Sequence, residues 1–400
     1  MHKTYQEINE KIRNKQAVVL SADKFIDLVE EKGLKHAAKE VDVVTTATFG
    51  PMCSSGAFLN VGHSNPKIKI QKAWLNDVQA YAGLAAVDLY IGATEIPDHD
   101  PANSDGKGSF SYGGGHVIHD LVAGKDVKLK ATAYGTDGYQ RKELETYINI
   151  KELNEAVLCN PRNCYQNYGI AINKSQKTIY TYMGALKPNV GNASYCSAGQ
   201  LSPLLKDPFY KTIGIGTRIF LAGAQGYVYW QGTQHDPHAK RNKSGCPLGG
   251  AGTLAVVGNL KEMNPEFIVG TSMKGYGATL SMGIGVPIPI LDEETAGYAA
   301  LKDEDLETSI IDYANDYPFC KTSNLGTRNY KELKSGKIEI DGKEVPTSSL
   351  SSYPKALKIA ALLKKEIEKG KFLLNKPAQP LPGTDWDEIF KPLKIRKKGD

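Results

Sequence analysis

The stretch Val41-Asp42-Val43-Val44-Thr45-Thr46 leads into Phe49-Gly50-Pro51-Met52-Cys53-Ser54-Ser55-Gly56. The first part is rich in β-branched residues, which favour strands, and its apolar side chains predict a buried strand. The second part is rich in Gly, Pro and Ser, which interrupt strands and form turns. The sequence therefore predicts that Cys53 lies in a loop just past the end of a buried strand.

The middle of the chain has the pattern of short strands. Val127, Leu129, Ala131 and Ala133 alternate with polar residues, as in a half-buried strand. Similar short runs occupy residues 177–183, 218–221, 227–230, 254–257 and 267–269. Glycines separate these runs, and helical patterns flank them. We therefore expect an α/β fold, with a large mixed body of glycine-bounded strands, flanking helices and a helical C-terminal segment.

The character of the chain changes after about residue 290. Residues 337–345 contain Asp341-Gly342 between two apolar-polar runs, which predicts a hairpin with a type I′ turn. Residues 354–369 form a basic amphipathic pattern that ends at Gly370, which predicts a helix. We expect a main catalytic body over 1–295, a hairpin and helical part packed on it over 296–375, and an extended basic tail over 376–400.

Composition excludes several classes of function. The 400 residues include 49 basic and 44 acidic side chains, and the net charge of +5 is too small to indicate a nucleic-acid interface. The N-terminus lacks the apolar core of a signal peptide, and no stretch has the length of a membrane span. Six cysteines are too few for a disulfide scaffold and are expected to be reduced. We expect a cytoplasmic protein that binds neither membrane nor nucleic acid.

Cys53 is the strongest candidate for chemistry. A cysteine beside Gly and Ser after a strand can have its thiolate stabilised by backbone N–H groups. Such a thiolate can form an acyl thioester, or accept sulfur as a persulfide. Equally, Cys53 can be a small buried residue of the core, because cysteine is among the most often buried residue types.

Other polar residues are candidates for substrate contacts. Ser54 and Ser55 adjoin Cys53, and the N–H groups of their loop can stabilise an oxyanion. Arg162, Arg218 and His235 are candidates to hold a carboxylate. His116 follows Gly113-Gly114-Gly115, where a helix N-terminus can bind an anion; the alternative is a structural position in the first turn of that helix.

The cysteine spacing does not favour a metal. Cys159 and Cys164 are separated by four residues, which is loose for zinc, and the chain has no second such pair. We therefore expect no zinc or iron–sulfur site and no cofactor bound by this chain.

Six ordered motifs resemble the homocysteine biosynthesis family, and the likeness covers about residues 5–375. The motifs are TATFGPMCSSG (46–56), ATAYGTD (131–137), NPRNCYQNY (160–168), IYTYMGAL (179–186), GTRIFLAGAQGYVYWQGTQH (216–235) and GGAGTLAVVGNL (249–260). The resemblance implies an L-aspartate semialdehyde sulfurtransferase, which makes homocysteine from that aldehyde, inorganic sulfur and reducing equivalents. It also implies that Cys53 holds the sulfur as a persulfide, and that a small ferredoxin-like iron–sulfur protein supplies the electrons.

The chain departs from this family in two ways. Long members end in paired CBS domains, and we expect regulation through such domains to be absent here. In many members a cysteine follows the Thr-Asp of the second motif, where this chain has Gly138. Cys164 or Cys196 is then the candidate for a second thiol.

Three other functions stay open at this stage. Cys53 can deliver sulfur to a different carbonyl or carboxyl substrate, or catalyse acyl or CoA transfer through a thioester. The chain can also be a non-catalytic sulfur carrier or scaffold. The sequence leaves open whether the chain forms a homo-oligomer.

Overall fold

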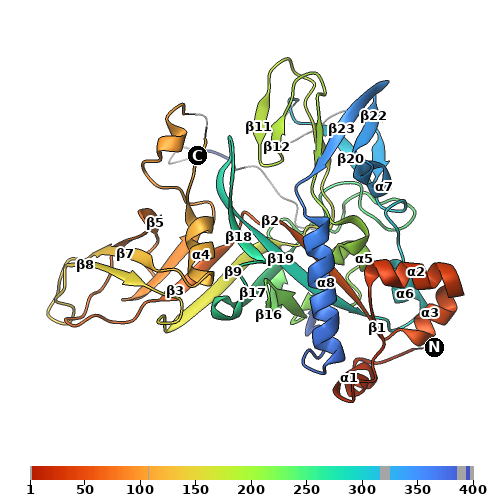
Figure 1. Cartoon of the computed structure of the whole chain (residues 1–400), viewed down its shortest axis with the longest axis horizontal. Coiled ribbons are helices and arrows are strands. Elements are labelled where there is room, and N and C mark those ends of the chain that lie inside the picture. Colours follow the sequence, from red (N-terminus) through yellow and green to blue (C-terminus); the bar gives the residue numbers. More distant parts are fainter. Residues whose placement is uncertain (1, 107, 316–324, 385–392, 397–400) are drawn as a thin grey trace.

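A ten-stranded mixed sheet forms the centre of this computed structural model, which describes residues 2–106, 108–315, 325–384 and 393–396 (Figure 1). The predicted mixed α/β class is confirmed. The strands follow the order β1 (Val19–Ser21), β2 (Val43–Pro51), β19 (Gly277–Pro289), β15 (Arg218–Leu221), β16 (Ala224–Gln231), β17 (Leu254–Asn259), β9 (Glu155–Asn163), β3 (Gly56–Asn60) and β6 (Asp88–Gly92), with β18 (Ile268–Met273) also beside β19.

The antiparallel pair β2 and β19 is the most deeply buried part of this sheet. Val43 lies opposite Pro289 and Pro51 lies opposite Ser281, so the ladder runs the whole length of β2. Helix α8 (Tyr353–Glu368) packs on both strands, as Figure 1 shows. A Cβ on Gly283 would lie 2.3 Å from Ile359 Cδ1, so this glycine allows the helix to approach the sheet closely.

A second lobe is built on a six-stranded sheet at the top of Figure 1. Its order is β21 (Thr327–Asn329), β20 (Glu307–Asp312), β10 (Ile170–Ile172), β13 (Ala193–Tyr195), β23 (Lys343–Ser349) and β22 (Lys337–Ile340). This sheet combines segments from both sides of the boundary expected near residue 295. The predicted type I′ turn is confirmed, because Asp341 and Gly342 have φ of 50° and 75°.

Smaller sheets complete the strand content. They are β5 (Val78–Ala80), β4 (Lys72–Leu75), β7 (Val127–Thr132) and β8 (Glu143–Ile148) in one sheet, β11 (Ile179–Thr181) with β12 (Gly184–Leu186), and β14 (Gly214–Ile215) with β24 (Gln379–Pro380). The β11–β12 hairpin stands out from the upper lobe in Figure 1. The pairing of β24 with β14 ties the start of the expected tail to the main body.

Helices cover the sheet edges and faces. The remaining helices are α1 (Tyr5–Arg13), α2 (Ala22–Lys32), α3 (Leu34–Glu40), α4 (Gly114–Val122), α5 (Pro203–Lys206), α6 (Glu293–Ala299) and α7 (Tyr330–Lys334). Among the described residues, no helix combines the length and the apolar character needed to cross a membrane. Cys320 and the tail residues Lys391, Lys397 and Lys398 lie outside the described residues.

The triple glycine before α4 has a packing role. A Cβ on Gly114 would lie 1.8 Å from the carbonyl oxygen of Gly92, and one on Gly115 would lie 2.1 Å from the carbonyl oxygen of Thr279. Both neighbours are backbone atoms, which cannot move aside as a side chain can. Only glycine therefore allows α4 to start in contact with β6 and β19.

Replacement of Gly115 by Ala is expected to lower the free energy of unfolding by about 1–3 kcal/mol, because α4 must shift away from β19. Urea unfolding followed by circular dichroism measures the change. The matched control is Gly138→Ala, where nothing lies within 4 Å of the added Cβ. We expect the control to stay within about 0.5 kcal/mol of the wild type. Equal stability of the two variants would contradict the close-packing account.

Candidate functional site

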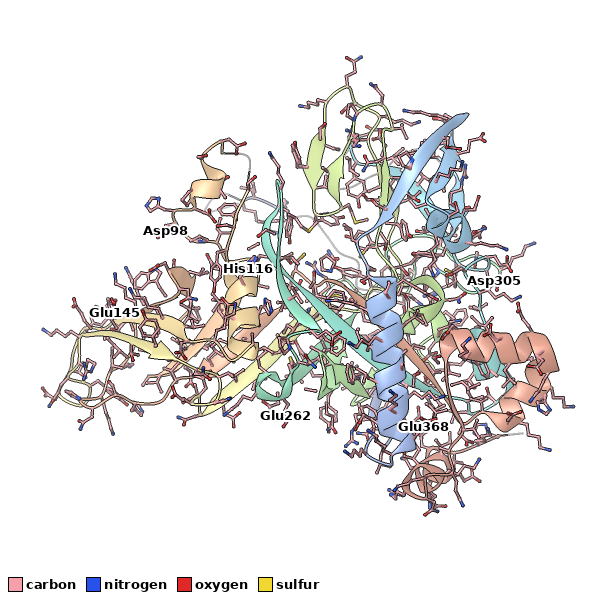
Figure 2. All side chains as sticks on the ribbon, in the orientation of Figure 1. Asp98, His116, Glu145, Glu262, Asp305 and Glu368 are labelled. Atoms are coloured by element: carbon pink, nitrogen blue, oxygen red, sulfur yellow. The ribbon has the colours of Figure 1, made fainter. Side chains whose placement is uncertain are left out.

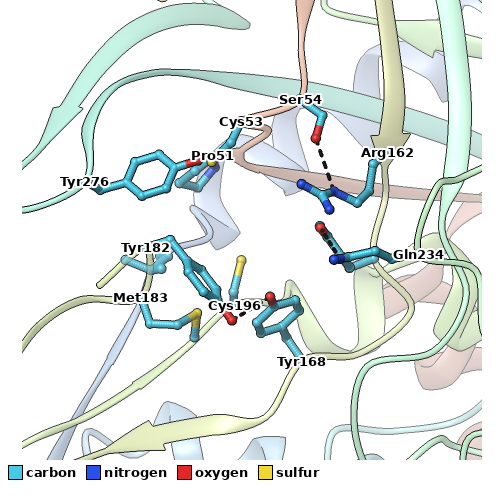
Figure 3. A pocket seen from close by; sticks show the side chains of 12 residues that line it. Pro51, Cys53, Ser54, Arg162, Tyr168, Tyr182, Met183, Cys196, Gln234 and Tyr276 are labelled. Atoms are coloured by element: carbon cyan, nitrogen blue, oxygen red, sulfur yellow. Dashed lines mark hydrogen bonds between the residues drawn. The ribbon is translucent and has the colours of Figure 1, made fainter. Parts of the chain in front are cut away.

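A cavity of about 470 Å³ opens beside the loop that joins β2 to β3 (Figure 3). Its walls come from that loop, the end of β9 and the β9–β10 connection, the β18–β19 turn, the β11–β12 hairpin and residues that follow β13, β16 and β23. The lining residues are Pro51, Cys53, Ser54, Arg162, Tyr165, Tyr168, Tyr182, Met183, Cys196, Gln234, Tyr276 and Leu350. Segments that are distant in the sequence therefore share one concave site, which we call the Cys53 cavity.

Cys53 lies two residues after β2 ends and three before β3 begins, as the sequence predicts. The Met52 N–H donates to Leu280 O at 2.7 Å, and the Ser55 N–H donates to Met52 O at 3.0 Å, so the loop is held on both sides of Cys53. The cysteine is a partly exposed free thiol. It is therefore not the fully buried core residue that the sequence left as an alternative.

The two serines after Cys53 have different environments. Ser54 lines the cavity and accepts a hydrogen bond from Arg162 Nε at 3.1 Å. Ser55 is buried, donates to Met52 O at 2.7 Å and accepts from Asn160 Nδ2 at 2.8 Å. Ser54 therefore faces the site together with Arg162, whereas Ser55 stabilises the loop through its hydrogen bonds to Met52 and Asn160.

Two tyrosines flank the thiol. Tyr276, in the turn between β18 and β19, interacts with the Cys53 sulfur, and Figure 3 shows its ring beside Cys53 and Pro51. Burial, followed by this contact with Cys53, raises the pKa of Tyr276. Burial also raises the pKa of Tyr165, whose hydroxyl donates to Gln234 Oε1 at 3.1 Å. Both phenols are therefore neutral hydrogen-bonding groups near neutral pH.

Three further phenols form a hydrogen-bonded row. Tyr168 Oη donates to Tyr182 Oη at 2.8 Å, and Tyr182 Oη and Tyr313 Oη are 3.0 Å apart. The rings of Tyr168 and Tyr182 meet edge to face with centroids 5.7 Å apart. Tyr168 and Tyr182 line the Cys53 cavity, and Figure 3 shows their hydroxyl groups meeting there.

Cys196 is the other thiol in the cavity. Its Sγ lies 3.5 Å from Ser351 Oγ, and Figure 3 shows it between Tyr168 and Tyr182. Burial raises the pKa of Cys196, and proximity to Cys53 adds to the rise. Cys164 does not line the cavity, and burial raises its pKa to about 12. Of the two candidates for a second thiol, the structure brings only Cys196 near Cys53.

The cavity has an unusual polar composition. Among the described residues that line it, Arg162 carries a permanent charge, and the remaining polar groups are thiols, phenols, a hydroxyl and an amide. None of these lining residues is His, Asp, Glu or Lys. Among these described lining residues, the groups suited to proton transfer are therefore thiols and phenols.

His116 does not line this cavity. It lies on α4, where its ring packs 5.4 Å from that of Tyr112 (Figure 2). The expected anion site at this helix N-terminus is not formed. The N–H groups of Gly114 and Gly115 already donate to Glu95 O at 2.8 Å and to Ala93 O at 2.9 Å.

Arg218 and His235 also do not line this cavity. Arg218 Nη1 donates to Leu373 O at 3.4 Å, and its guanidinium lies 5.6 Å from the ring centroid of Phe372. His235 is fully buried, and its Nε2 donates to Pro382 O at 2.9 Å. Both side chains hold the C-terminal segment against the main body. We therefore do not assign them to substrate binding at Cys53.

The tyrosines and Gln234 are the part of the site that sequence reasoning missed. Tyr165, Tyr168 and Tyr182 fall within the third and fourth motifs, and Gln234 is the penultimate residue of the fifth. Their position within motifs shared with the family was the sequence feature that could have marked them as site residues. No local spacing rule shows which tyrosines share a cavity, because they come from different elements.

Within the described ranges, no group of three or more His, Cys, Asp or Glu side chains is arranged to hold a metal ion.

A partly exposed thiol in a concave site beside an arginine and several phenols is an arrangement typical of enzymes that use a cysteine nucleophile. Residues 17–374 match the family described as "Homocysteine biosynthesis enzyme, sulfur-incorporation". The chain belongs to this family. No solved structure matches it.

Relatives support this assignment. The chain is 52% identical over 384 residues to an L-aspartate semialdehyde sulfurtransferase of Methanosarcina acetivorans, which covers 95% of this chain and 72% of the relative. It is 48% identical over 408 residues to a protein of the same name from Methanocaldococcus jannaschii, and the match covers 99% of this chain and 76% of the relative. An uncharacterized protein of Methanothermobacter thermautotrophicus is 29% identical over 316 residues, and the match covers 76% of this chain and 67% of the relative.

Alkylation should distinguish the cysteines of the folded protein. We expect iodoacetamide to modify Cys53 in native protein, because it is partly exposed and lines the open cavity. Cys164 and Cys246 are buried and have pKa values raised to about 12, so they should react only after unfolding. Peptide mass spectrometry at pH 7.5 measures each site. Protection of Cys53 with reaction at Cys164 would contradict the arrangement of the site.

Proposed function

We propose that this chain is an L-aspartate semialdehyde sulfurtransferase in which Cys53 delivers sulfur to the aldehyde carbon and homocysteine is formed. The observation that carries the proposal is that the Cys53 thiol shares a cavity with Arg162 and a set of phenols. The family and the names of the relatives from Methanosarcina acetivorans and Methanocaldococcus jannaschii support the same activity.

The first step is loading of sulfur on Cys53: the thiolate takes the outer sulfur of a persulfide or polysulfide donor, and the donor leaves as a thiol or a shorter polysulfide. With sulfide as the source, the same step needs a two-electron oxidant. The terminal sulfur of a persulfide is more acidic and more nucleophilic than a thiol, and covalent loading divides one difficult step into two easier ones. The cavity beside Cys53 is large enough to hold a four-carbon amino acid next to this sulfur.

The second step joins the sulfur to the substrate. The persulfide anion adds to the aldehyde carbon, and one proton goes to the aldehyde oxygen, giving Cys–S–S–CH(OH)R. Two electrons and two protons cleave the S–S bond, releasing HS–CH(OH)R and regenerating the Cys53 thiol. Loss of water gives the thioaldehyde, and two further electrons and two protons give the thiol R–CH₂–SH.

Arg162 is our candidate for the carboxylate of the substrate. Its Nε bond to Ser54 fixes the plane of the guanidinium, and Figure 3 shows the group facing the cavity between Ser54 and Gln234. A guanidinium can bind a carboxylate through two parallel hydrogen bonds. None of the lining residues that the structure describes is an Asp or Glu that would compete for this charge.

The electrons must come from outside the cavity, since thiols and phenols cannot supply them catalytically. We propose an iron–sulfur protein of the ferredoxin type as the donor, following the family resemblance. A thiol that must return to its reduced form also favours a reducing compartment, so we place the reaction in the cytoplasm.

Loading of sulfur should depend on Cys53. Protein treated with sulfide and a mild oxidant is expected to gain the mass of one sulfur, and Cys53→Ser should gain none. Homocysteine formation from L-aspartate semialdehyde and a low-potential chemical reductant should fall to background in the same variant. Cys246→Ser is the matched control, because that thiol is buried away from the cavity.

A sulfur gain that persists in Cys53→Ser would overturn the assignment of the carrier. A thioester on Cys53 in place of a persulfide would instead support acyl transfer. Loading without turnover would indicate a carrier or scaffold.

Removal of the Arg162 charge should weaken substrate binding selectively. We expect Arg162→Gln to raise KM for L-aspartate semialdehyde about 10- to 100-fold, because a hydrogen bond to a charged group is lost. KM for an aldehyde without a carboxylate, such as propanal, should change by less than about threefold. Steady-state kinetics measure both, with exposed Arg13→Gln as the control. An equal rise for both aldehydes would show that Arg162 does not bind the carboxylate.

A further inference from the structure

Addition of sulfur to an aldehyde requires a proton at the aldehyde oxygen. Among the described residues that line the Cys53 cavity, none is His, Asp, Glu or Lys, and the guanidinium of Arg162 does not release its proton near neutral pH. The thiol of Cys53 is occupied by sulfur at this stage. The Cys196 thiol also lines the cavity and lies 3.5 Å from Ser351 Oγ. Among these described residues we favour a phenol as the proton donor, because the phenols are hydrogen-bonded to further hydroxyl groups that can replace a donated proton.

The phenols differ in what supports them. Tyr182 Oη lies within hydrogen-bond distance of two other phenols, Tyr168 at 2.8 Å and Tyr313 at 3.0 Å. Tyr276 contacts the Cys53 sulfur itself, and Tyr165 donates to Gln234. Tyr182 is thus the cavity phenol with phenolic partners on two sides.

This arrangement stabilises the anion that proton donation leaves behind. A phenolate accepts hydrogen bonds, and those made to a charged group are about twice as strong as neutral ones. Burial raises the pKa of Tyr168, so that neighbour remains a protonated donor while Tyr182 carries the charge. A lone buried phenolate would lack this stabilisation.

The row of phenols connects the Cys53 cavity with a second cavity. A second cavity of about 310 Å³ lies next to the first, and Tyr165, Tyr168, Tyr182 and Gln234 line both. Tyr313 lines only the second cavity, together with Asp236. A polar space of this size can admit water, so the second cavity can return protons to the row.

We propose that Tyr182 is the catalytic proton donor to the aldehyde oxygen, that Tyr168 and Tyr313 are positioning residues that stabilise its phenolate, and that Tyr313 restores its proton. This inference rests on the proposed function and adds the acid that the reaction needs.

The step conserves atoms and charge. The lone pair of the terminal persulfide sulfur forms the S–C bond, the π pair of the C=O moves to oxygen, and the Tyr182 O–H bond breaks as its proton joins that oxygen. The products are the hemithioacetal and the phenolate of Tyr182. A proton then passes from Tyr313 to Tyr182, and water in the second cavity replaces the proton of Tyr313. No electron transfer is involved.

The test uses Tyr182→Phe in the full chain. We expect kcat for homocysteine formation to fall about 10²- to 10⁴-fold, while KM changes less than about threefold. Persulfide loading of Cys53, measured by intact mass, should equal that of the wild type. The residual activity should also lose the solvent deuterium isotope effect of the wild type. A merely structural role would leave that isotope effect in place.

A second variant keeps the test independent of any folding defect. Tyr313 does not line the Cys53 cavity, so Tyr313→Phe leaves the substrate contacts intact and should lower kcat about tenfold. Tyr180→Phe is the matched control, because Tyr180 is on the same hairpin, contacts Lys274 and lines neither cavity. It should match the wild type.

Each result decides a different point. Retention of more than a third of kcat in Tyr182→Phe would overturn the role of Tyr182, as would loss of persulfide loading in that variant. Wild-type kcat in Tyr313→Phe would overturn the role of the row. Failure of the wild type to form homocysteine would instead reject the proposed function, and this inference with it.

Discussion

The register between β2 and β19 is the constraint on which the site depends. Pro51 pairs with Ser281, and the ladder continues through the Met52 N–H bond to Leu280 O. Cys53 therefore lies just past one end of the ladder. The turn between β18 and β19, which carries Tyr276, lies close to this end. A slip of one residue would move every side chain of β2 to the opposite face of the sheet. The full burial of β19 makes such a slip costly, and this holds the thiol in place.

The described lining of the cavity combines one fixed cation with neutral, polarisable groups. Arg162 comes from β9, and the phenols come from the second lobe and the β18–β19 turn. Electrostatic interactions are stronger in a partly enclosed site than in water, so one guanidinium suffices to orient an anionic substrate. The absence of carboxylates from the described lining also avoids repulsion of a persulfide anion. Phenols whose pKa is raised by burial can donate hydrogen bonds without adding charge.

Much of the fold was accessible from local patterns. The strand before Cys53, the Asp341-Gly342 hairpin and the helix ending before Gly370 follow from periodicity and turn chemistry, which act over a few residues. The triple glycine was ambiguous, because turn formation, anion binding and close packing all require glycine. The structure resolves it as close packing of α4 against β6 and β19.

The sequence by itself determined the family, the mixed α/β class and the position of Cys53 after a buried strand, because each depends on contiguous residues. Tertiary structure alone decided which distant side chains accompany that thiol. Arg162, Tyr182 and Cys196 converge on it, whereas Arg218 and His235 turn to the C-terminal segment. The physical reason is that a side chain's face is set by strand register and lobe packing, which involve partners more than a hundred residues away.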